Sequence, residues 1–337
     1  MIFEKVYGID LGNSSVKIIS GTPGTVYTEK NIIASKGREI IAVGDEAYAM
    51  LGKQPQDIRV KSPMAFGMIA ELELQEIVLY TMFNRIGDTQ GFRSIIYFTA
   101  PPDMSPIEKR AYYYVANGHW MRQHKVFLVE SPMAEALALG INPDDPTGNM
   151  IVNIGSESTS FAIIADGRII ISRKLQTGGK QMTEAVCAEI RSEHHLQIGY
   201  MTGHMLKNEL GSLGEDEKKG IRVIGIDSVS GLPREEMVTS DVVRAGILNS
   251  LSGLAAEMKT FLERIPPQIA MHIKKEGIYL TGGTARLPEL HQYLADYTGF
   301  IFNLPDIYEK SCIMGLGKII ENKELRRFAQ PVTERRL

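Results

Sequence analysis

The stretch MIVNIGSESTSFAII (residues 150–164) consists of an apolar run, a short polar turn and a second apolar run. This pattern predicts a strand, a tight turn and a returning strand. A turn of this kind can direct backbone N–H groups at an anion such as a phosphate. Phosphate-binding turns usually contain glycines, because glycine lets the backbone approach the anion closely. Here the first strand ends near Asn153 and the turn contains Glu157, so its ability to hold a phosphate is in question.

A second stretch of the same kind, VYGIDLGNSSVKII (residues 6–19), opens the chain. It predicts a strand that enters a turn after Asp10 and returns from Ser15 onward. We interpret residues 6–21 and 149–173 as an internal duplication in which each copy opens one lobe. Two similar lobes leave a cleft between them, which is the usual place for a ligand.

A third glycine turn lies in IYLTGGTARLP (residues 278–288), where a strand enters a Gly-Gly pair and a helix follows. Each turn alone is a weak signal. Any hairpin can carry Asp-X-Gly, and a strand–Gly–Gly–helix unit also serves ordinary packing of a helix on a strand. The three turns in this order are far more specific together than any of them is singly.

The alternation of strand-like apolar runs with long helical patterns predicts an α/β protein. The bulk composition is that of an ordinary globular protein. The 337 residues are 44% hydrophobic and 23% charged, and the net charge of −3 does not favour nucleic acid as a partner. Cys187 and Cys312 lie far apart and form no metal-binding pair, which indicates a reducing cytoplasm. No apolar run reaches the roughly 18 residues that span a bilayer.

Local signals place several helices and one linker. Residues 71–85 have helical spacing, and SPIE (residues 105–108) combines a serine cap, a proline at the first helical position and a glutamate at the third. Residues 132–140 predict a helix that ends at Gly140. The sequence NPDDPTG (residues 142–148) is the most linker-like segment of the chain.

Taken together, the three turns resemble the actin superfamily. Longer blocks resemble the bacterial actin MreB, and they extend from about residue 6 to residue 322. Among them are VESPMAEALALGI (129–141), DPTGNMIVNIG (145–155) and IPPQIAMHIKKEGIYLTGG (265–283). The resemblance implies an actin-like ATPase fold, with two lobes that each carry a core and a smaller subdomain around a nucleotide cleft. Lobe I would span 1–141 with a small subdomain at about 30–67, lobe II 142–317 with one at about 181–245, and 318–337 would return to lobe I.

The resemblance also implies a site for ATP or ADP with Mg²⁺. In this site Asp10 would face the hydrated Mg²⁺ through water, and Lys17 would approach the β-phosphate. A lysine at position 17 fits actin better than typical MreB. The residues placed around the nucleotide are Asp10, Gly12, Asn13, Ser14, Ser15 and Lys17 in the first turn, Gly155, Ser156, Glu157, Ser158 and Thr159 in the second, Lys207 and Glu209 near the ribose, and Gly282 and Gly283 beside the adenosine.

Three positions connected with hydrolysis are degenerate: Glu130, Ser131 and Asn153. MreB usually has Glu-Glu-Pro at 130–132, and its second glutamate orients the attacking water. The serine found here can hydrogen-bond a water but does not readily take its proton. Asn153 replaces an aspartate that holds metal-bound water, and an amide brings no charge to the ion.

Two further departures lie beside the second phosphate turn. Glu157 stands where the family has a glycine close to the γ-phosphate, and Lys180 stands where the family has an acid. At ~5 Å and an effective dielectric constant of about 20, two like charges repel by on the order of 3 kcal/mol. We therefore expect either that Glu157 points away from the cleft or that nucleotide binding is weakened.

These departures lead to the hypothesis of a polymerising actin homologue with weak or absent ATPase activity. The competing interpretation is drift at tolerated positions, with Glu130 or Glu157 supplying the missing carboxylate. Two other functions remain open: an actin-fold kinase of small molecules, and a non-filamentous adaptor like the division and pilus-assembly relatives of actin. No insertion that would form a substrate pocket supports the kinase.

The family also implies partners. MreB proteins form homopolymeric filaments on the inner membrane and organise rod-shape and wall-elongation proteins. We expect a cytoplasmic protein whose membrane contact would come from the loop GDTQGFRS (87–94), with Phe92 as its only wedge, or from the N-terminal Met1, Ile2 and Phe3. Either contact buries little apolar area, so attachment would depend on the many copies in a filament.

Overall fold

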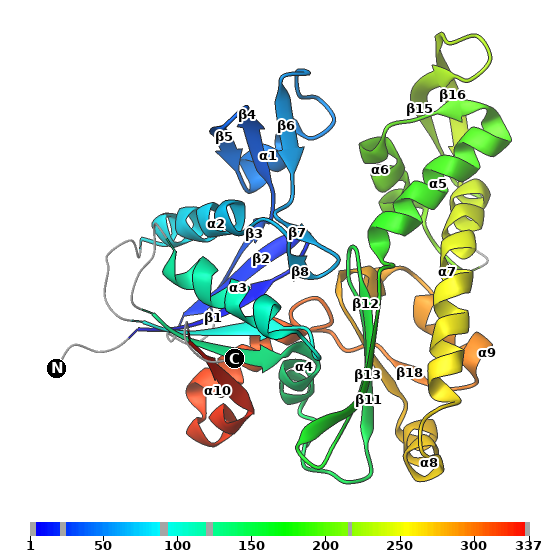
Figure 1. Ribbon diagram of the computed structural model, residues 1–337. Coiled ribbons are helices and arrows are strands. Elements are labelled where there is room, and N and C mark those ends of the chain that lie inside the picture. The colour runs from blue at the N-terminus through cyan, green and yellow to red at the C-terminus, as the bar shows by residue number, and fades with distance from the viewer. Residues whose placement is uncertain (1–4, 21–24, 88–93, 119–123, 215–217, 334–337) are drawn as a thin grey trace. The chain divides into compact units, whose positions relative to one another are not determined.

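The chain forms two compact units in a computed structural model that describes residues 5–20, 25–87, 94–118, 124–214 and 218–333. Unit 1 comprises Met1–Pro146, Ala162–Ser172 and Glu309–Leu337, and unit 2 comprises Thr147–Phe161 and Arg173–Tyr308. Both contain helices and sheets, so the predicted α/β class is confirmed (Figure 1).

The main sheet of unit 1 has the strand order β19-β10-β9-β1-β2-β3. Its strands are β1 (Val6–Leu11), β2 (Ser15–Ser20), β3 (Val26–Lys30), β9 (Ile95–Ala100), β10 (Lys125–Glu130) and β19 (Ala329–Val332). β1, β9 and β10 are parallel, whereas β2, β3 and β19 pair antiparallel with their neighbours. Because parallel strands end at the same edge of a sheet, Asp10, Thr99 and Glu130 come to one edge.

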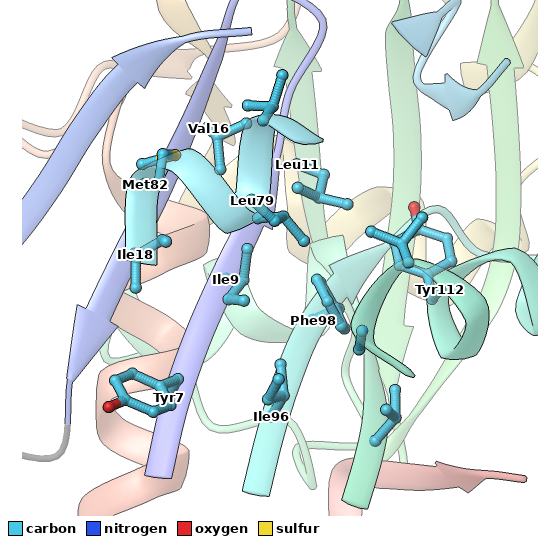
Figure 2. Packing of buried hydrophobic residues seen from close by; sticks show 14 of the residues in the cluster. Tyr7, Ile9, Leu11, Val16, Ile18, Leu79, Met82, Ile96, Phe98 and Tyr112 are labelled. Carbon is cyan, nitrogen blue, oxygen red and sulfur yellow. The ribbon is translucent and has the colours of Figure 1, made fainter. Parts of the chain in front are cut away.

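Helices cover both faces of this sheet, as the alternation of side chains along β1 requires. Ile9 belongs to the core cluster with Leu79 of α2 (Leu72–Arg85) and Tyr112 of α3 (Pro106–Asn117), and Figure 2 shows these side chains together. Phe98 of β9 meets Tyr112 edge-on, with the ring centroids 5.5 Å apart. On the opposite face, Gly8 lies against α10 (Ser311–Glu321), because a Cβ at Gly8 would be 2.9 Å from Leu316 Cβ.

α10 also packs on α4 (Ser131–Leu139), and η2 (Lys323–Phe328) follows it. Gly315 allows the close approach of the two helices, because a side chain there would collide with the carbonyl of Ala134. The predicted helix end at Gly140 is confirmed, since this residue has a left-handed φ of 75°. The predicted capping box is confirmed as well: Glu108 Oε2 accepts from Ser105 N at 2.6 Å, and Ser105 Oγ accepts from Glu108 N at 3.4 Å.

Two smaller sheets complete the description of unit 1. The order β5-β4-β6 joins β4 (Ile33–Lys36), β5 (Glu39–Val43) and β6 (Ile58–Lys61), with α1 (Asp45–Met50) against them. A short ribbon pairs β7 (Met64–Ala65) with β8 (Met68–Ile69).

A five-stranded sheet contains the second strand–turn–strand stretch, in the order β13-β12-β11-β17-β18. Its strands are β11 (Asn149–Ile154), β12 (Thr159–Ala165), β13 (Arg168–Leu175), β17 (Ile278–Thr281) and β18 (Phe302–Asn303). β11 and β17 are parallel and in register, so that Asn153 lies opposite Thr281 at the carboxyl end of both strands. The third glycine turn therefore follows β17 at the same sheet edge as the second turn.

The helices of unit 2 pack around α7 (Ser240–Leu262), which contacts α5 (Gly179–His194), α6 (Tyr200–Leu210) and α9 (Leu290–Thr298). α8 (Pro267–Glu276) lies against β11, and η1 (Gly283–Arg286) follows β17. Phe161 and Phe261 join strand and helix in this core, with ring centroids 5.5 Å apart.

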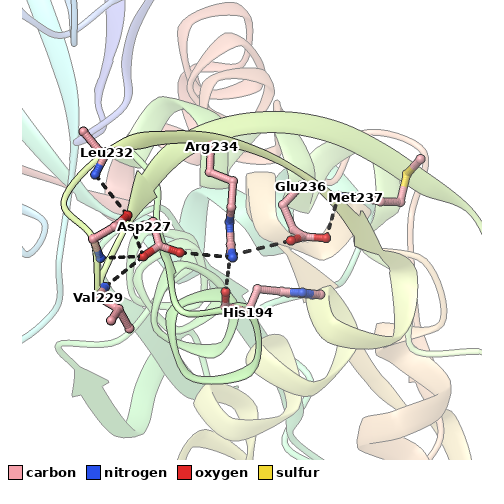
Figure 3. Close-up of polar contacts among 8 residues, drawn as sticks. His194, Asp227, Val229, Leu232, Arg234, Glu236 and Met237 are labelled. Carbon is pink, nitrogen blue, oxygen red and sulfur yellow. Dashed lines mark hydrogen bonds and ion pairs between the residues drawn. The ribbon is translucent and has the colours of Figure 1, made fainter.

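A three-stranded sheet in unit 2 has the order β14-β15-β16, formed by β14 (Leu196–Gln197), β15 (Gly220–Asp227) and β16 (Pro233–Thr239). Figure 3 shows the polar network that fixes the turn of this hairpin. Arg234 bonds Asp227 at 3.0 Å, the carbonyl of His194, and Glu236 at 3.6 Å. The hairpin nevertheless exposes large apolar side chains: Ile224 is 71% exposed, Leu232 65% and Val229 85%.

Candidate functional site

The first turn connects β1 and β2 and carries an ion pair at its base. The N–H of Gly12 donates to the carbonyl of Ser15 at 3.0 Å and closes the turn. Asp10 lies directly opposite Lys17 in the antiparallel register, and Lys17 Nζ is 3.4 Å from Asp10 Oδ2. Thr99 donates its hydroxyl to the other carboxylate oxygen at 2.6 Å. The charge of Asp10 is therefore balanced within unit 1.

Asn13 ties the first turn to the short β7–β8 ribbon. Its side-chain oxygen accepts from the N–H of Gly67 at 2.6 Å, and its carbonyl accepts from Ser62 Oγ at 3.1 Å. Behind the turn, the buried Asn31 donates to the carbonyl of Gly12 at 2.9 Å and to Gln75 at 3.1 Å. The side-chain oxygen of Asn13 is thus used inside the protein. These hydrogen bonds were not predicted, because Gly67 and Gln75 are distant in sequence from the first turn.

Glu130 and Ser131 lie where β10 ends and α4 begins. Ser131 donates its hydroxyl to the carbonyl of Ala100 at 3.0 Å, so its proton already has an acceptor on the neighbouring strand. Partial burial, and secondly the negative charge of Asp103, raise the pKa of Glu130 above its ordinary value, while Lys109 opposes the shift. A carboxylate with a raised pKa is a stronger base, so Glu130 is better suited to take a proton than Ser131.

The second turn repeats the backbone geometry of the first. The N–H of Gly155 donates to the carbonyl of Ser158 at 2.9 Å. Thr159, fully buried, donates its hydroxyl to the carbonyl of Thr177 at 2.7 Å and anchors the start of β12. The two predicted strand–turn–strand stretches therefore share the backbone hydrogen bond that closes the turn.

The third turn packs against the second. Gly282 has a φ of 89°, a conformation that favours glycine, and a Cβ there would lie 2.8 Å from Asn153 Oδ1. Thr284, on the first turn of η1, donates its hydroxyl to the carbonyl of Gly155 at 2.8 Å. By contrast, a Cβ at Gly283 would meet open space. Gly282 is therefore required by the fold, while Gly283 leaves room beside the turn.

The start of α5 completes this cluster. The N–H of Gly179 donates to the carbonyl of Gly155 at 3.0 Å, and that of Lys180 donates to Ser156 at 2.7 Å. Lys180 Nζ also pairs with Glu157 Oε1 at 2.9 Å. Glu157 and Lys180 had been considered separately in the sequence, and the structure shows that they are partners. The sequence did offer one signal for this pairing, because the two departures from the family pattern carry opposite charges.

Lys207 of α6 also reaches the start of α5. It donates to the carbonyl of Gly179 at 2.6 Å. Burial, and secondly the positive charge of Arg286, lower the pKa of Lys207 to about 8. Glu209 is exposed on the same helix, and two positions correspond to about 200° around a helix. The structure therefore brings Lys207 to the start of α5, while Glu209 is exposed on another side of α6.

Comparison with known proteins identifies the family. The MreB/Mbl protein family matches residues 4–327. The chain belongs to the MreB/Mbl family. The cell shape-determining protein MreB of Escherichia coli is 30% identical over 307 residues, which cover 88% of each chain, and the cell shape-determining protein Mbl of Bacillus subtilis is 31% identical over 299 residues, 88% of this chain and 89% of its own.

Solved structures agree with the fold. MreB5 of Spiroplasma citri bound to ADP has a TM-score of 0.88 at 30% identity over 96% of this chain and 98% of that one. The same protein bound to AMPPNP has a TM-score of 0.90 at 29% identity, covering 97% and 98%. MamK, in a double helical filament, shares the fold at a TM-score of 0.77 and 16% identity, covering 95% and 99%. The expected actin-like α/β fold and the resemblance to MreB are confirmed.

The expected membrane-contacting residues, Phe92 and Met1, Ile2 and Phe3, lie outside the described residues. In the ranges that the structure describes, no helix combines the length and the apolar character needed to cross a membrane. Within those ranges, no group of three or more His, Cys, Asp and Glu side chains is placed to hold a metal ion.

Proposed function

We propose that this MreB/Mbl-family chain binds an adenine nucleotide through its glycine turns and polymerises into cytoskeletal filaments that determine cell shape, with weak or absent ATP hydrolysis. The observation that carries the proposal is the duplicated turn. Gly12 and Gly155 make the same backbone hydrogen bond at the ends of corresponding strands. Turns of this kind direct N–H groups at anions. In the third turn, the open space beside Gly283 suits the approach of the adenosine.

The relatives support an adenine nucleotide as the ligand, since MreB5 of Spiroplasma citri has been solved with ADP and with AMPPNP. The residues present also fit Mg²⁺ if the nucleotide phosphates and water supply most of its ligands. Mg²⁺ commonly keeps several waters and uses one or two carboxylates beside nucleotide phosphates. Asp10 would hold such an ion through water, with one of its oxygens bonded by Thr99 and the other near Lys17. The ion would neutralise phosphate charge.

Weak hydrolysis is supported by the two substituted positions. Asn153 brings a neutral oxygen to the end of β11, and Ser131 donates its proton to the carbonyl of Ala100. Phosphoryl transfer to water needs a group that orients the water and accepts its proton. In this chain Glu130, with its raised pKa, is the carboxylate that would provide the remaining activity.

Self-association is supported by the apolar side chains on the β15–β16 hairpin. Ile224, Val229 and Leu232 are each at least 65% exposed, and exposed apolar side chains gathered on one element mark contact surfaces. We assign this surface to a second copy of the chain. Association with the inner membrane and with rod-shape and wall-elongation proteins is part of the proposal by family membership.

Sedimentation at high speed tests polymerisation, on purified protein with ATP, with ADP and without nucleotide. We expect the protein to pellet above a critical concentration, with phosphate release below that of Escherichia coli MreB measured alongside. The double substitution Ile224→Ser and Leu232→Ser should raise the critical concentration at least tenfold, which corresponds to about 1.4 kcal/mol. Adding anionic liposomes to the same assay tests membrane attachment.

Met271→Ser is the matched control, because Met271 is 68% exposed on α8 and lies on a different element. It should leave the critical concentration unchanged. Protein that stays in the supernatant at every concentration and with every nucleotide contradicts the filament proposal. Equal pelleting of the hairpin variant would leave polymerisation intact and exclude the hairpin as its contact.

A further inference from the structure

An ion pair joins the tip of the second turn to the first turn of α5. Lys180 is bound to this turn twice: its N–H donates to the carbonyl of Ser156 at 2.7 Å, and its ammonium group lies 2.9 Å from Glu157 Oε1. Its main-chain position is therefore set by the turn itself. The Glu157 side chain is only 15% exposed, whereas that of Lys180 is 44% exposed. A carboxylate with so little water around it depends on its partner for stabilisation.

The position of Lys180 on its helix is unusual in electrostatic terms. The N-terminus of a helix carries a partial positive charge, so cations are disfavoured there and anions are favoured. Lys180 nevertheless lies in the first turn of α5, which contains no acidic residue. Glu157, which reaches this cation from the neighbouring turn, offsets the unfavourable placement. Each charge is therefore unfavourably placed by itself, and the two stabilise each other.

Glycines bring this pair close to the backbone of the turn. A Cβ at Gly178 would lie 2.9 Å from the amide nitrogen of Glu157 and 2.6 Å from the carbonyl oxygen of Gly155. The ion pair is thus immediately beside the amides that the proposed function assigns to a phosphate. A carboxylate beside these amides repels a phosphate unless a positive charge lies close to it, because two negative charges interact strongly where water is partly excluded.

We propose that Lys180 is a positioning residue that neutralises Glu157 and thereby keeps the second turn able to accept the phosphates of a nucleotide. This inference rests on the proposed nucleotide binding. Lys180 acts through Glu157 and not by contact with the phosphate. A cation at residue 180 then makes a glutamate in the turn compatible with phosphate binding, and removal of both charges restores an acceptable site.

The test compares four proteins: the natural chain, Lys180→Gln, Glu157→Gln and the double variant. Their affinities for fluorescently labelled ATP and ADP are measured by titration at low and at high salt. We expect Lys180→Gln to weaken binding by about tenfold, because it removes the positive charge that lies 2.9 Å from the carboxylate. Glu157→Gln should bind more tightly than the natural chain, because it removes a negative charge beside the turn and leaves the positive charge of Lys180. The double variant should return to within about twofold of the natural chain.

Salt provides a readout that loss of structure alone would not produce. Raising the ionic strength to about 1 M reduces the Debye length to about 3 Å. In Lys180→Gln, high salt therefore screens the repulsion between the Glu157 carboxylate and the phosphates. The difference in nucleotide affinity between this variant and the natural chain should become smaller. Lys36→Gln is the matched control, because Lys36 also pairs with a carboxylate, Asp57 at 2.8 Å, but on the small β5-β4-β6 sheet. It should leave nucleotide affinity unchanged. Circular dichroism melting verifies that each variant is folded.

Three results would overturn the inference, and they are distinguishable. If Lys180→Gln binds as the natural chain does, the ion pair has no effect on the site. If the defect of Lys180→Gln persists in the double variant, Lys180 contacts the phosphate directly. If neither the natural chain nor Glu157→Gln binds either nucleotide, the proposed function itself fails, and the inference fails with it.

Discussion

The first and second turns have the same backbone and different charges. In β1 and in β11 the same positions are buried: three consecutive residues, then a partly exposed one, then a buried one before the glycine. Gly12 and Gly155 close their turns with N–H···O bonds of 3.0 and 2.9 Å. The same burial pattern along the strand and the same glycine hydrogen bond therefore accompany both turns.

The charged groups of the two turns lie at different places. In the first turn the carboxylate is Asp10, at the end of the strand, and its cation Lys17 lies across the strand pair. In the second turn the strand ends in the neutral Asn153, the carboxylate is Glu157 within the turn, and the cation Lys180 comes from α5. Each turn keeps a balanced ion pair although the positions differ. The backbone restricts the shape of the turn but leaves the position of the charges free.

The largest effect should follow from breaking the buried pair of the first turn. Asp10→Asn leaves Lys17, whose side chain is only 9% exposed, without a counter-charge. Removing one partner of a buried ion pair destabilises a protein by about 4 kcal/mol. We expect this loss in the free energy of unfolding, measured by urea denaturation followed by circular dichroism.

Asp10→Asn combined with Lys17→Met is the control, since a buried pair replaced by groups without charge is often close to neutral. The double variant should regain most of the lost stability. Glu157→Gln, the corresponding change in the second turn, should destabilise by less than about 1 kcal/mol, because Lys180 is 44% exposed and remains hydrated. Equal losses in the two turns would contradict the difference drawn between them.

The local parts of this picture could be predicted from the sequence. Strand patterns around Gly12 and Gly155, the capping box at Ser105 and the helix end at Gly140 depend on residues within a few positions of each other, and the structure confirms them. Blocks of resemblance along most of the chain indicated the MreB family, and the family match confirms it.

The parts that escaped prediction depend on residues that are distant in sequence. Asn13 is held by Gly67, and Glu157 pairs with Lys180, which lies 23 positions further along the chain. No periodicity or local propensity encodes such contacts, because they form only when the elements pack. The exposed apolar side chains of the hairpin, such as Leu232, were missed because an exposed strand face and a buried one have similar sequences.

A pH titration sharpens the comparison through Lys207, which bonds the start of α5 beside the second turn. Its pKa is lowered from 10.5 to about 8 in the folded protein, so the unfolded chain binds the proton more tightly. Stability therefore rises with pH between about 8 and 10.5, where the unfolded state holds the extra proton. At 1.36 kcal/mol per pKa unit, the rise is about 3 kcal/mol.

The measurement is the difference between the natural chain and Lys207→Met in the free energy of unfolding at several pH values. The variant should be the more stable protein at pH 7, and its advantage should disappear by about pH 10.5. A difference that does not change with pH would show that Lys207 titrates normally. Lys274→Met, on α8, is a control for the general titration of lysines.

The smallest effect tests whether the two turns are geometrically equal. A Cβ at Gly12 would lie 2.9 Å from the carbonyl oxygen of Ser15, and one at Gly155 would lie 3.0 Å from that of Ser158. Both distances are at the limit of what a neighbouring backbone atom tolerates, so each alanine must push its turn open. Overpacking of this kind destabilises a protein by about 1–2 kcal/mol.

We therefore expect Gly12→Ala and Gly155→Ala to lower the free energy of unfolding by amounts that agree within about 0.5 kcal/mol. Gly283→Ala is the control, because its Cβ would meet open space, and it should change stability by less than about 0.5 kcal/mol. The result that would separate the turns is a loss in one of them at least twice that in the other. In that case the two turns would differ in rigidity despite the shared hydrogen bond. The cause would be α5 and η1, which bond the second turn at Gly155.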